Sequence, residues 1–124
     1  MSFDVFFQGF LAGASSERGG VQMREVLAPH ISEEDGTFLR VRVGDGEADL
    51  YLRDDGMMAN HIAGRDPWDL LVQGARAANW VIMPAGCPTC LTQSRQQEEL
   101  PQGLDDEVVV VETGADLRAV IESR

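Results

Sequence analysis

The sequence predicts an α+β fold with a mostly antiparallel sheet, in which the elements follow the order β-α-β-β-β-α-β-β-α and the helices pack on one face. Three observations lead to this fold class. Runs of alternating apolar and polar residues follow one another between positions 36 and 63, as in an antiparallel meander. Separate segments repeat apolar residues at helical spacing. The 124 residues, 44% of them hydrophobic, suffice for one core but not for two, so we expect a single domain over residues 1–124.

The N-terminal part is expected to contain a strand, a loop and a helix. Apolar residues alternate with more polar ones from Phe3 to Phe10, which predicts the first strand. The small and polar residues from Ala14 to Gly20 are typical of a mobile loop. A helix is expected from Val21 to Ala28, and Pro29 ends it, because the residue before a proline disfavours helical geometry.

The meander is expected to have three strands between Gly36 and Ala63. Asp45-Gly46 joins the first two runs, and Asp55-Gly56 leads into a third run with less distinct faces. Both dipeptides favour tight turns. One face of the meander is apolar, and cross-strand pairing explains the charges on the other face. Those charges belong to Arg40, Arg42, Asp49 and Arg53.

The segment from Asp66 to Cys90 predicts a helix, a strand and a turn. Asp66 fits the N-cap and Pro67 the first helical position. The apolar stripe of this helix would comprise Trp68, Leu71, Val72, Ala75 and Ala78. A short buried strand is expected from Trp80 to Met83, where a proline and a glycine follow the apolar run.

The C-terminal part predicts a short helical segment, a strand and a last helix. The polar residues 92–97 predict one or two helical turns. Four consecutive valines between Glu107 and Glu112 are typical of a buried strand. Thr113 fits the N-cap of the last helix, with Asp116 three residues further on. The apolar stripe of this helix would be Leu117, Val120 and Ile121.

The charge of the chain excludes several functions. The net charge is −11, and all 10 basic residues are arginines. Without lysine there is no Schiff-base chemistry and no P-loop. Without a basic patch we expect no nucleic-acid partner. The N-terminus lacks the positive charge of a signal peptide, and no run approaches the roughly 18 apolar residues of a membrane span. We therefore expect a cytoplasmic protein with no membrane partner.

Cys87-Pro88-Thr89-Cys90 is the one short motif with a chemical mechanism attached. A strand, a C-x-x-C pair and a following helix resemble the active-site context of thioredoxin-like and glutaredoxin-like enzymes. A helix beginning at Cys90 would lower the pKa of a thiol at its cap. Cys87 would then be the nucleophile and Cys90 the resolving thiol. The other interpretation is that both are small buried residues in a turn, since free cysteine is among the most buried residue types.

No metal or cofactor is expected. Zinc would need His30 and His61 to complete the Cys87 and Cys90 pair, but the two histidines are far apart in the sequence and fit no common zinc spacing. The chain also lacks G-x-S-x-G, H-E-x-x-H and a glycine-rich phosphate loop. Catalysis other than thiol exchange therefore has no candidate residues.

Acidic residues in expected loops form the candidate binding surface. They are Glu33, Glu34, Asp35, Asp54, Asp55, Asp105 and Asp106. One interpretation is that they are solvated loop ends that keep the chain soluble. The other is a negative surface that captures a basic protein, as small acidic immunity proteins and nucleic-acid mimics do. We expect a non-catalytic binding protein, with a protein partner or a second copy as its ligand, and thiol-disulfide exchange as the alternative.

The opening residues, Met1 to Phe10, belong to a set of segments that continues with residues 49–52, 84–89, 108–111 and 114–115. These segments resemble a family of small bacterial proteins, mainly from high-GC genomes, that begin with this strand. Arginine without lysine agrees with a high-GC coding sequence. The resemblance implies a single-domain bacterial protein. It assigns no functional residue, because the family has no established activity.

Overall fold

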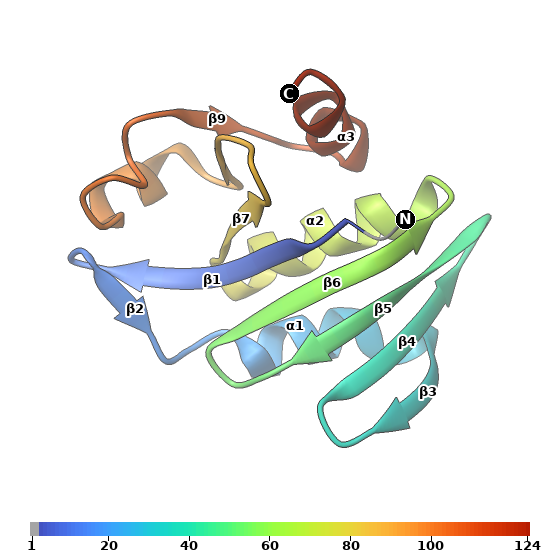
Figure 1. Cartoon of the computed structure of the whole chain (residues 1–124). Coiled ribbons are helices and arrows are strands. Elements are labelled where there is room, and N and C mark those ends of the chain that lie inside the picture. Colours follow the sequence, from blue (N-terminus) through green and yellow to red (C-terminus); the bar gives the residue numbers. More distant parts are fainter. Residues whose placement is uncertain (1–2) are drawn as a thin grey trace.

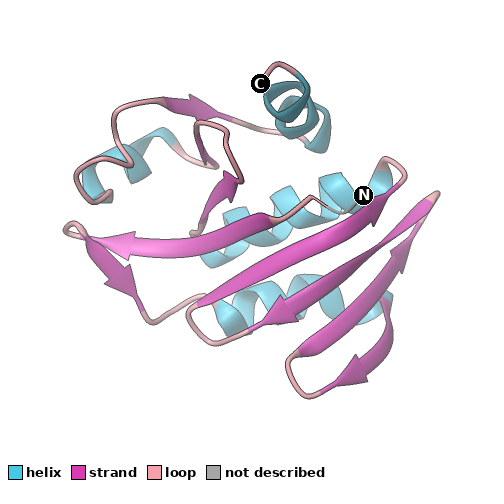
Figure 2. Cartoon of the chain, in the orientation of Figure 1, coloured by secondary structure: helices cyan, strands magenta, loops and turns pink. Residues whose placement is uncertain are grey.

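The computed structural model describes residues 3–124, in which nine strands form one open sheet accompanied by helices (Figure 1, Figure 2). Met1 and Ser2, where the expected resemblance begins, lie outside the described residues. The strands are β1 (Val5–Leu11), β2 (Ala14–Ser16), β3 (Ile31–Asp35), β4 (Phe38–Val43), β5 (Gly46–Leu52), β6 (Gly56–Ala63), β7 (Val81–Pro84), β8 (Thr89–Leu91) and β9 (Val108–Val110). The α-helices are α1 (Gly20–Leu27), α2 (Asp66–Ala78) and α3 (Gly114–Glu122), and the 3-10 helices are η1 (Ala28–His30) and η2 (Ser94–Glu99).

The sheet is antiparallel except at one edge. Its strand order is β3-β4-β5-β6-β1-β7-β8-β9, and β2 forms a hairpin with the end of β1. Within residues 3–124 only the pairing of β8 with β9 is parallel. The expected α+β class with a mostly antiparallel sheet is therefore confirmed. The N-terminal strand β1 lies inside the sheet, between β6 and β7.

The three α-helices pack on one face of the sheet, as the sequence predicts (Figure 1). Helix α2 lies between α1 and α3 and contacts both. Leu71 and Ala75 of α2 are fully buried. Gly74 of α2 lies against Met23 of α1, so the two helices approach closely. The strands contribute Val5, Phe7, Leu39, Val41, Leu50, Ala59 and Ile82 to the same core. In the described part of the chain, no helix is long and apolar enough to cross a membrane.

Three short strands occupy segments in which the sequence predicts loops or turns. β3 lies before the expected meander and makes it four-stranded, β2 lies in the expected loop after β1, and β8 contains Cys90. Each of them pairs with a neighbouring strand: β3 with β4, β2 with β1, and β8 with β7. Such pairing satisfies backbone hydrogen-bonding groups even where local strand propensity is weak.

The valine-rich strand is shorter and less buried than expected. β9 comprises only Val108–Val110 and lies at the edge of the sheet. Val110 is 46% exposed, whereas Val111, beyond the strand, is fully buried in the core. The expectation that all four valines between Glu107 and Glu112 form a buried strand is therefore only partly met, because an edge strand has a neighbouring strand on one side only.

The start of α2 also differs from the expectation. Arg65, and not Asp66, occupies the N-cap, and its side chain makes no capping bond. The capping acceptor is instead the carboxylate of Asp45, in the turn between β4 and β5. That turn consists of Gly44 and Asp45, one residue earlier than expected. The helix is therefore capped from a distant turn.

The start of α3 is as expected. The hydroxyl oxygen of Thr113 accepts a hydrogen bond from the amide of Asp116 at 3.1 Å, and the carboxylate of Asp116 accepts one from the amide of Thr113 at 3.3 Å. The carboxylate of Asp69 on α2 accepts a further bond from the amide of Gly114 at 2.7 Å. The starts of α2 and α3 are therefore joined directly.

Candidate functional site

The face of the sheet opposite the helices carries a row of apolar side chains. Successive strand pairings place Phe38 opposite Tyr51, Tyr51 opposite Met58, Met58 opposite Phe6, and Phe6 opposite Met83. We call these five residues, on β4, β5, β6, β1 and β7, the apolar row. Their neighbours along the strands point to the helices and are buried in the core, because successive side chains of a strand alternate between its two faces. The apolar row therefore consists of outward-pointing residues of the same strands whose alternate residues form the core.

The apolar row is accessible to solvent. Phe6 is 44% exposed and Tyr51 39% exposed, and the other three side chains are half-buried. The rings of Phe38 and Tyr51 lie 5.5 Å apart, in a tilted arrangement. Aromatic side chains on neighbouring strands stabilise a sheet by packing on each other, which explains part of the row. Met83 also packs against a second small core formed by Val81, Leu91 and Leu100. Neither contact explains why Phe6 and Tyr51 remain exposed.

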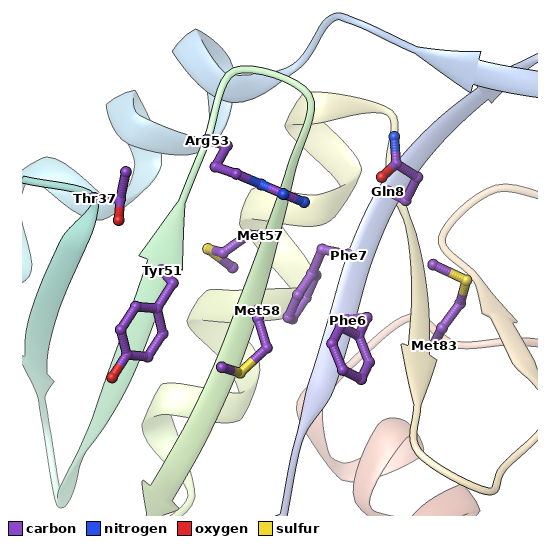
Figure 3. Close-up of a pocket in the computed structure, with 9 residues that line it drawn as sticks. All are labelled: Phe6, Phe7, Gln8, Thr37, Tyr51, Arg53, Met57, Met58 and Met83. Atoms are coloured by element: carbon purple, nitrogen blue, oxygen red, sulfur yellow. The ribbon is translucent and has the colours of Figure 1, made fainter.

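A depression of about 460 Å³ lies over one side of the row (Figure 3). Its lining residues are Phe6, Phe7, Gln8, Thr37, Tyr51, Arg53, Met57, Met58 and Met83. Phe7 and Met57 belong to the core and form its floor, next to Gly56, which has no side chain. Arg53 extends across the start of β6 in Figure 3. The depression therefore combines apolar walls, adaptable methionines and one cation.

Polar side chains border the apolar row on both sides. On one side Asp49 accepts a hydrogen bond from Nε of Arg40 at 2.9 Å, and Nδ1 of His61 lies 3.2 Å from its other carboxylate oxygen. The bond with Asp49 raises the pKa of Arg40. On the same side, Nδ2 of Asn60 donates a hydrogen bond to the carboxylate of Asp4 at 3.3 Å. An apolar centre with a polar border is the usual composition of a protein interface.

Arg53 and Gln8 border the other side of the row. Nε of Arg53 lies 3.8 Å from the carboxylate of Asp55, and the Gln8 amide donates to the backbone carbonyl of Asp55 at 2.9 Å. The Arg53 side chain is 66% exposed, so its guanidinium remains available to a ligand. The cross-strand charge pairs expected on this face are present for Arg40 with Asp49 and for Arg42 with Glu47.

The seven acidic residues of the predicted binding surface do not form one patch. Glu33, Glu34 and Asp35 lie on β3, at one edge of the sheet, and Asp105 and Asp106 precede β9, at the opposite edge. Asp54 and Asp55 lie in the turn between β5 and β6. Three of the seven are paired with arginines: Glu33 with Arg40, Glu34 with Arg24 and Asp55 with Arg53. A ligand on the outward face would meet only part of this charge.

The two cysteines lie in and before β8. Cys87 is half-buried, and its thiol contacts the carbonyl of Ala85 at 3.7 Å. Cys90 is fully buried, and burial together with nearby Cys87 raises the pKa of its thiol to about 12. Cys90 belongs to a strand and not to the start of a helix. The helical effect that would activate a thiol is therefore not provided at Cys90.

The histidines lie apart from the cysteines. His30 ends η1, while His61 belongs to β6 and contacts Asp49. Among residues 3–124, no group of three His, Cys, Asp or Glu side chains is arranged to hold a metal ion.

Sequence reasoning missed the apolar row as a unit. It identified the outward face of the meander by its charges, although Phe38 and Tyr51 occupy outward positions in the same strands. The available signal was an aromatic residue at an outward position in each of three strands, with Phe6 as the third. Comparisons with known protein families, with curated proteins and with solved structures each found no match to this chain.

Proposed function

We propose that this chain is a non-catalytic binding protein that holds a basic protein partner on the outward face of its sheet. The observation that carries the proposal is the apolar row. It runs across five adjacent strands, and its residues Phe6 and Tyr51 are exposed to solvent. Contiguous apolar patches on a protein surface often mark interaction sites. Partly exposed aromatic residues at the centre of such a surface are typical interface anchors.

The charge supports a basic partner. The chain carries a net charge of −11, and Asp4, Asp49 and Asp55 lie beside the row or its depression. A negative field accelerates the encounter with a positively charged protein, and at 0.1 M ionic strength salt screens this field beyond about 10 Å. The apolar row would then supply the lasting contact, and the charge would supply the fast association.

The test uses the immobilised protein and row variants. Phe6→Ser and Tyr51→Ser each remove an exposed ring, and Val110→Ser is the matched control, because Val110 is 46% exposed but lies on edge strand β9. A protein captured from the source-organism lysate is identified by mass spectrometry, produced separately and titrated by calorimetry. We expect a basic protein whose affinity falls by roughly tenfold or more in each row variant and is unchanged by Val110→Ser.

Salt provides the second arm of this test. Raising NaCl from about 0.05 M to about 0.5 M should slow association and weaken binding. Binding that is equal in the row variants would contradict the proposed surface. Binding that is indifferent to salt, or a partner without net positive charge, would contradict the electrostatic part.

A further inference from the structure

A second hollow lies where the β1–β2 hairpin meets the start of α1 and the end of α2, and we call it the hairpin hollow. In Figure 1 the hairpin extends further to the left than either helix. Phe10 and Leu11 of β1, Ser16 of β2, Gln22 of α1 and Ala78 of α2 are among the lining residues. The volume of the hollow is about 470 Å³, which is within the range of small-molecule pockets. None of the described residues lines both this hollow and the depression over the apolar row.

Part of the hairpin hollow is apolar. Leu11 is 65% exposed, which is more than either exposed ring of the apolar row. Phe10 is half-buried and also packs against the second small core. Ala77 and Ala78, in the last turn of α2, add small apolar side chains to the lining. An apolar group bound in the hollow would cover Leu11 and gain the free energy of removing its side chain from water.

The hairpin hollow presents one charge, and it is positive. Among the described residues that line the hollow, Arg18 alone is charged. Arg18 is exposed, and the ion pairs within residues 3–124 do not include it. Glu17, its neighbour in the sequence, lines a different depression together with Asp54 and Asp55. The guanidinium is therefore free to pair with an anion in the hollow, although the chain as a whole is acidic.

Uncharged polar side chains complete the lining of the hairpin hollow. They are the hydroxyl of Ser16 and the amides of Gln22 and Asn79. The amide oxygen of Asn79 accepts a hydrogen bond from Nε2 of Gln96 at 3.1 Å, which leaves the amide nitrogen as a donor. These groups can donate hydrogen bonds to the oxygens of an acidic ligand. Apolar walls with a few polar groups that orient the ligand are the usual composition of a small-molecule site.

We infer that the hairpin hollow binds a small amphipathic anion, with its carboxylate or phosphate at Arg18 and its apolar body on Leu11 and Phe10. Charge complementarity selects an anion, because Arg18 is the charge that the hollow presents. The volume of the hollow selects a small molecule over a protein surface. The inference does not depend on the proposed function, since it uses none of the residues of the apolar row.

The first experiment compares octanoate with octylammonium, which have the same chain length and opposite charges. Each is titrated to about 10 mM into the isotope-labelled protein at about 0.1 M NaCl, and amide chemical shifts are followed by nuclear magnetic resonance. We expect saturable shifts at residues 9–11, 16–22 and 77–79, with a dissociation constant of about 1 mM for octanoate. Octylammonium should bind there at least roughly tenfold more weakly. Octyl phosphate tests the other acidic group in the same way.

The net charge makes this comparison stringent. A chain of net charge −11 attracts octylammonium and repels octanoate at long range. A preference for octanoate must therefore come from a local positive charge. Inorganic phosphate, titrated in parallel, has no apolar body and should bind more weakly than octyl phosphate.

The second experiment uses variants of the hollow with matched controls. Arg18→Gln and Leu11→Ser should each raise the dissociation constant of octanoate by roughly fivefold or more. The backbone carbonyl of Arg18, which accepts from the Trp80 indole at 2.7 Å, remains in Arg18→Gln. Arg65→Gln and Val110→Ser should leave the constant unchanged, because Arg65 is exposed before α2 and Val110 lies on edge strand β9. Circular dichroism checks that each variant retains the fold.

The outcomes decide the inference separately from the proposed function. Equal binding of octylammonium and octanoate, or binding that Arg18→Gln leaves unchanged, would overturn the anion site. Shifts confined to the depression over the apolar row, or no saturable shifts with either octyl anion, would overturn the hollow as the site. Inorganic phosphate that binds as tightly as octyl phosphate would overturn the apolar part. Capture of a basic protein should be unchanged in Arg18→Gln and Leu11→Ser, so that either conclusion can fail while the other stands.

Discussion

Asp45 and Asp66 cap each other's backbone across the fold. The carboxylate of Asp45 accepts hydrogen bonds from the amides of Arg65 and Asp66, both at 2.9 Å, while the carboxylate of Asp66 accepts one from the amide of Asp45 at 3.2 Å. The turn between β4 and β5 is thereby attached to the start of α2. The amide bonds from Asp66 and then Arg65 lower the pKa of Asp45 below its ordinary value.

Asp45→Ala should destabilise the protein, because the first amides of α2 lose their acceptor. We expect the melting temperature at neutral pH to fall by a few degrees. Since the pKa of Asp45 is lower in the folded state, its contribution is complete above the unfolded pKa of about 3.9 and is lost as the pH falls through the folded pKa. The difference between wild type and variant should therefore shrink in acid.

Thermal melts at a series of pH values would measure this effect. Asp106→Ala is the control, since Asp106 is exposed and lies in the loop before β9. An equal loss in the control, or a difference that grows toward acid, would show that Asp45 does not act as the cap.

Gly19→Ala should destabilise the protein strongly. Gly19 has a φ of +115°, and a Cβ there would overlap the indole of Trp80, which is fully buried and donates to the carbonyl of Arg18 at 2.7 Å. Gly13 has a φ of +81° with open space around it, so Gly13→Ala imposes backbone strain without overlap. In urea unfolding we expect a loss of about 1 kcal/mol for Gly13→Ala and roughly 2–4 kcal/mol for Gly19→Ala. Equal losses of stability in the two variants would mean that the Trp80 indole shifts to make room for the added Cβ.

Iodoacetamide should label Cys87 and spare Cys90 in the reduced, folded protein. Cys87 is half-buried, whereas Cys90 is fully buried with a thiol pKa of about 12, so little thiolate forms and none is accessible. Mass spectrometry should find one label under native conditions and two in urea. Equal native rates at both cysteines would revive thiol-disulfide exchange as the function, because exchange requires both sulfur atoms to be reached.

Thr113→Ala should remove the side-chain cap of α3. The hydroxyl of Thr113 accepts from the amide of Asp116, so its loss should lower the free energy of unfolding by about 1 kcal/mol. Thr37→Ala, in the exposed turn before β4, is the matched control. Denaturant titrations followed by circular dichroism would measure both. A control variant that loses as much stability would argue against the cap.

Local patterns in the sequence predicted the elements whose signals come from residues close together in the chain. The start of α3 follows from Thr113 and Asp116, which are three residues apart, and the stripe of α2 follows from its 3.6-residue period. The strands from Phe38 to Leu52 follow from their period of two. These signals are local because the interacting residues are close in sequence.

The candidate site was only partly predictable. Sequence alone identified Asp49, Arg40 and Arg53 as outward charges, and the structure shows them beside the apolar row. It did not bring together Phe6, Tyr51 and Met58, because the sequence leaves open the place of β1 in the sheet and does not distinguish the two faces of β6. It also treated Cys90 as the possible start of a helix, whereas pairing with β7 makes it part of a strand.

The sequence by itself determined the fold class, the main helices, the alternation of the strands and the net charge of −11, since each depends on composition or on neighbours in the chain. The tertiary structure decided the insertion of β1 between β6 and β7, the capping of α2 by Asp45 and the alignment of the apolar row. These features depend on contacts between distant segments. Such contacts form only when the whole sheet assembles against its helices, because the backbone and side-chain partners come from different strands.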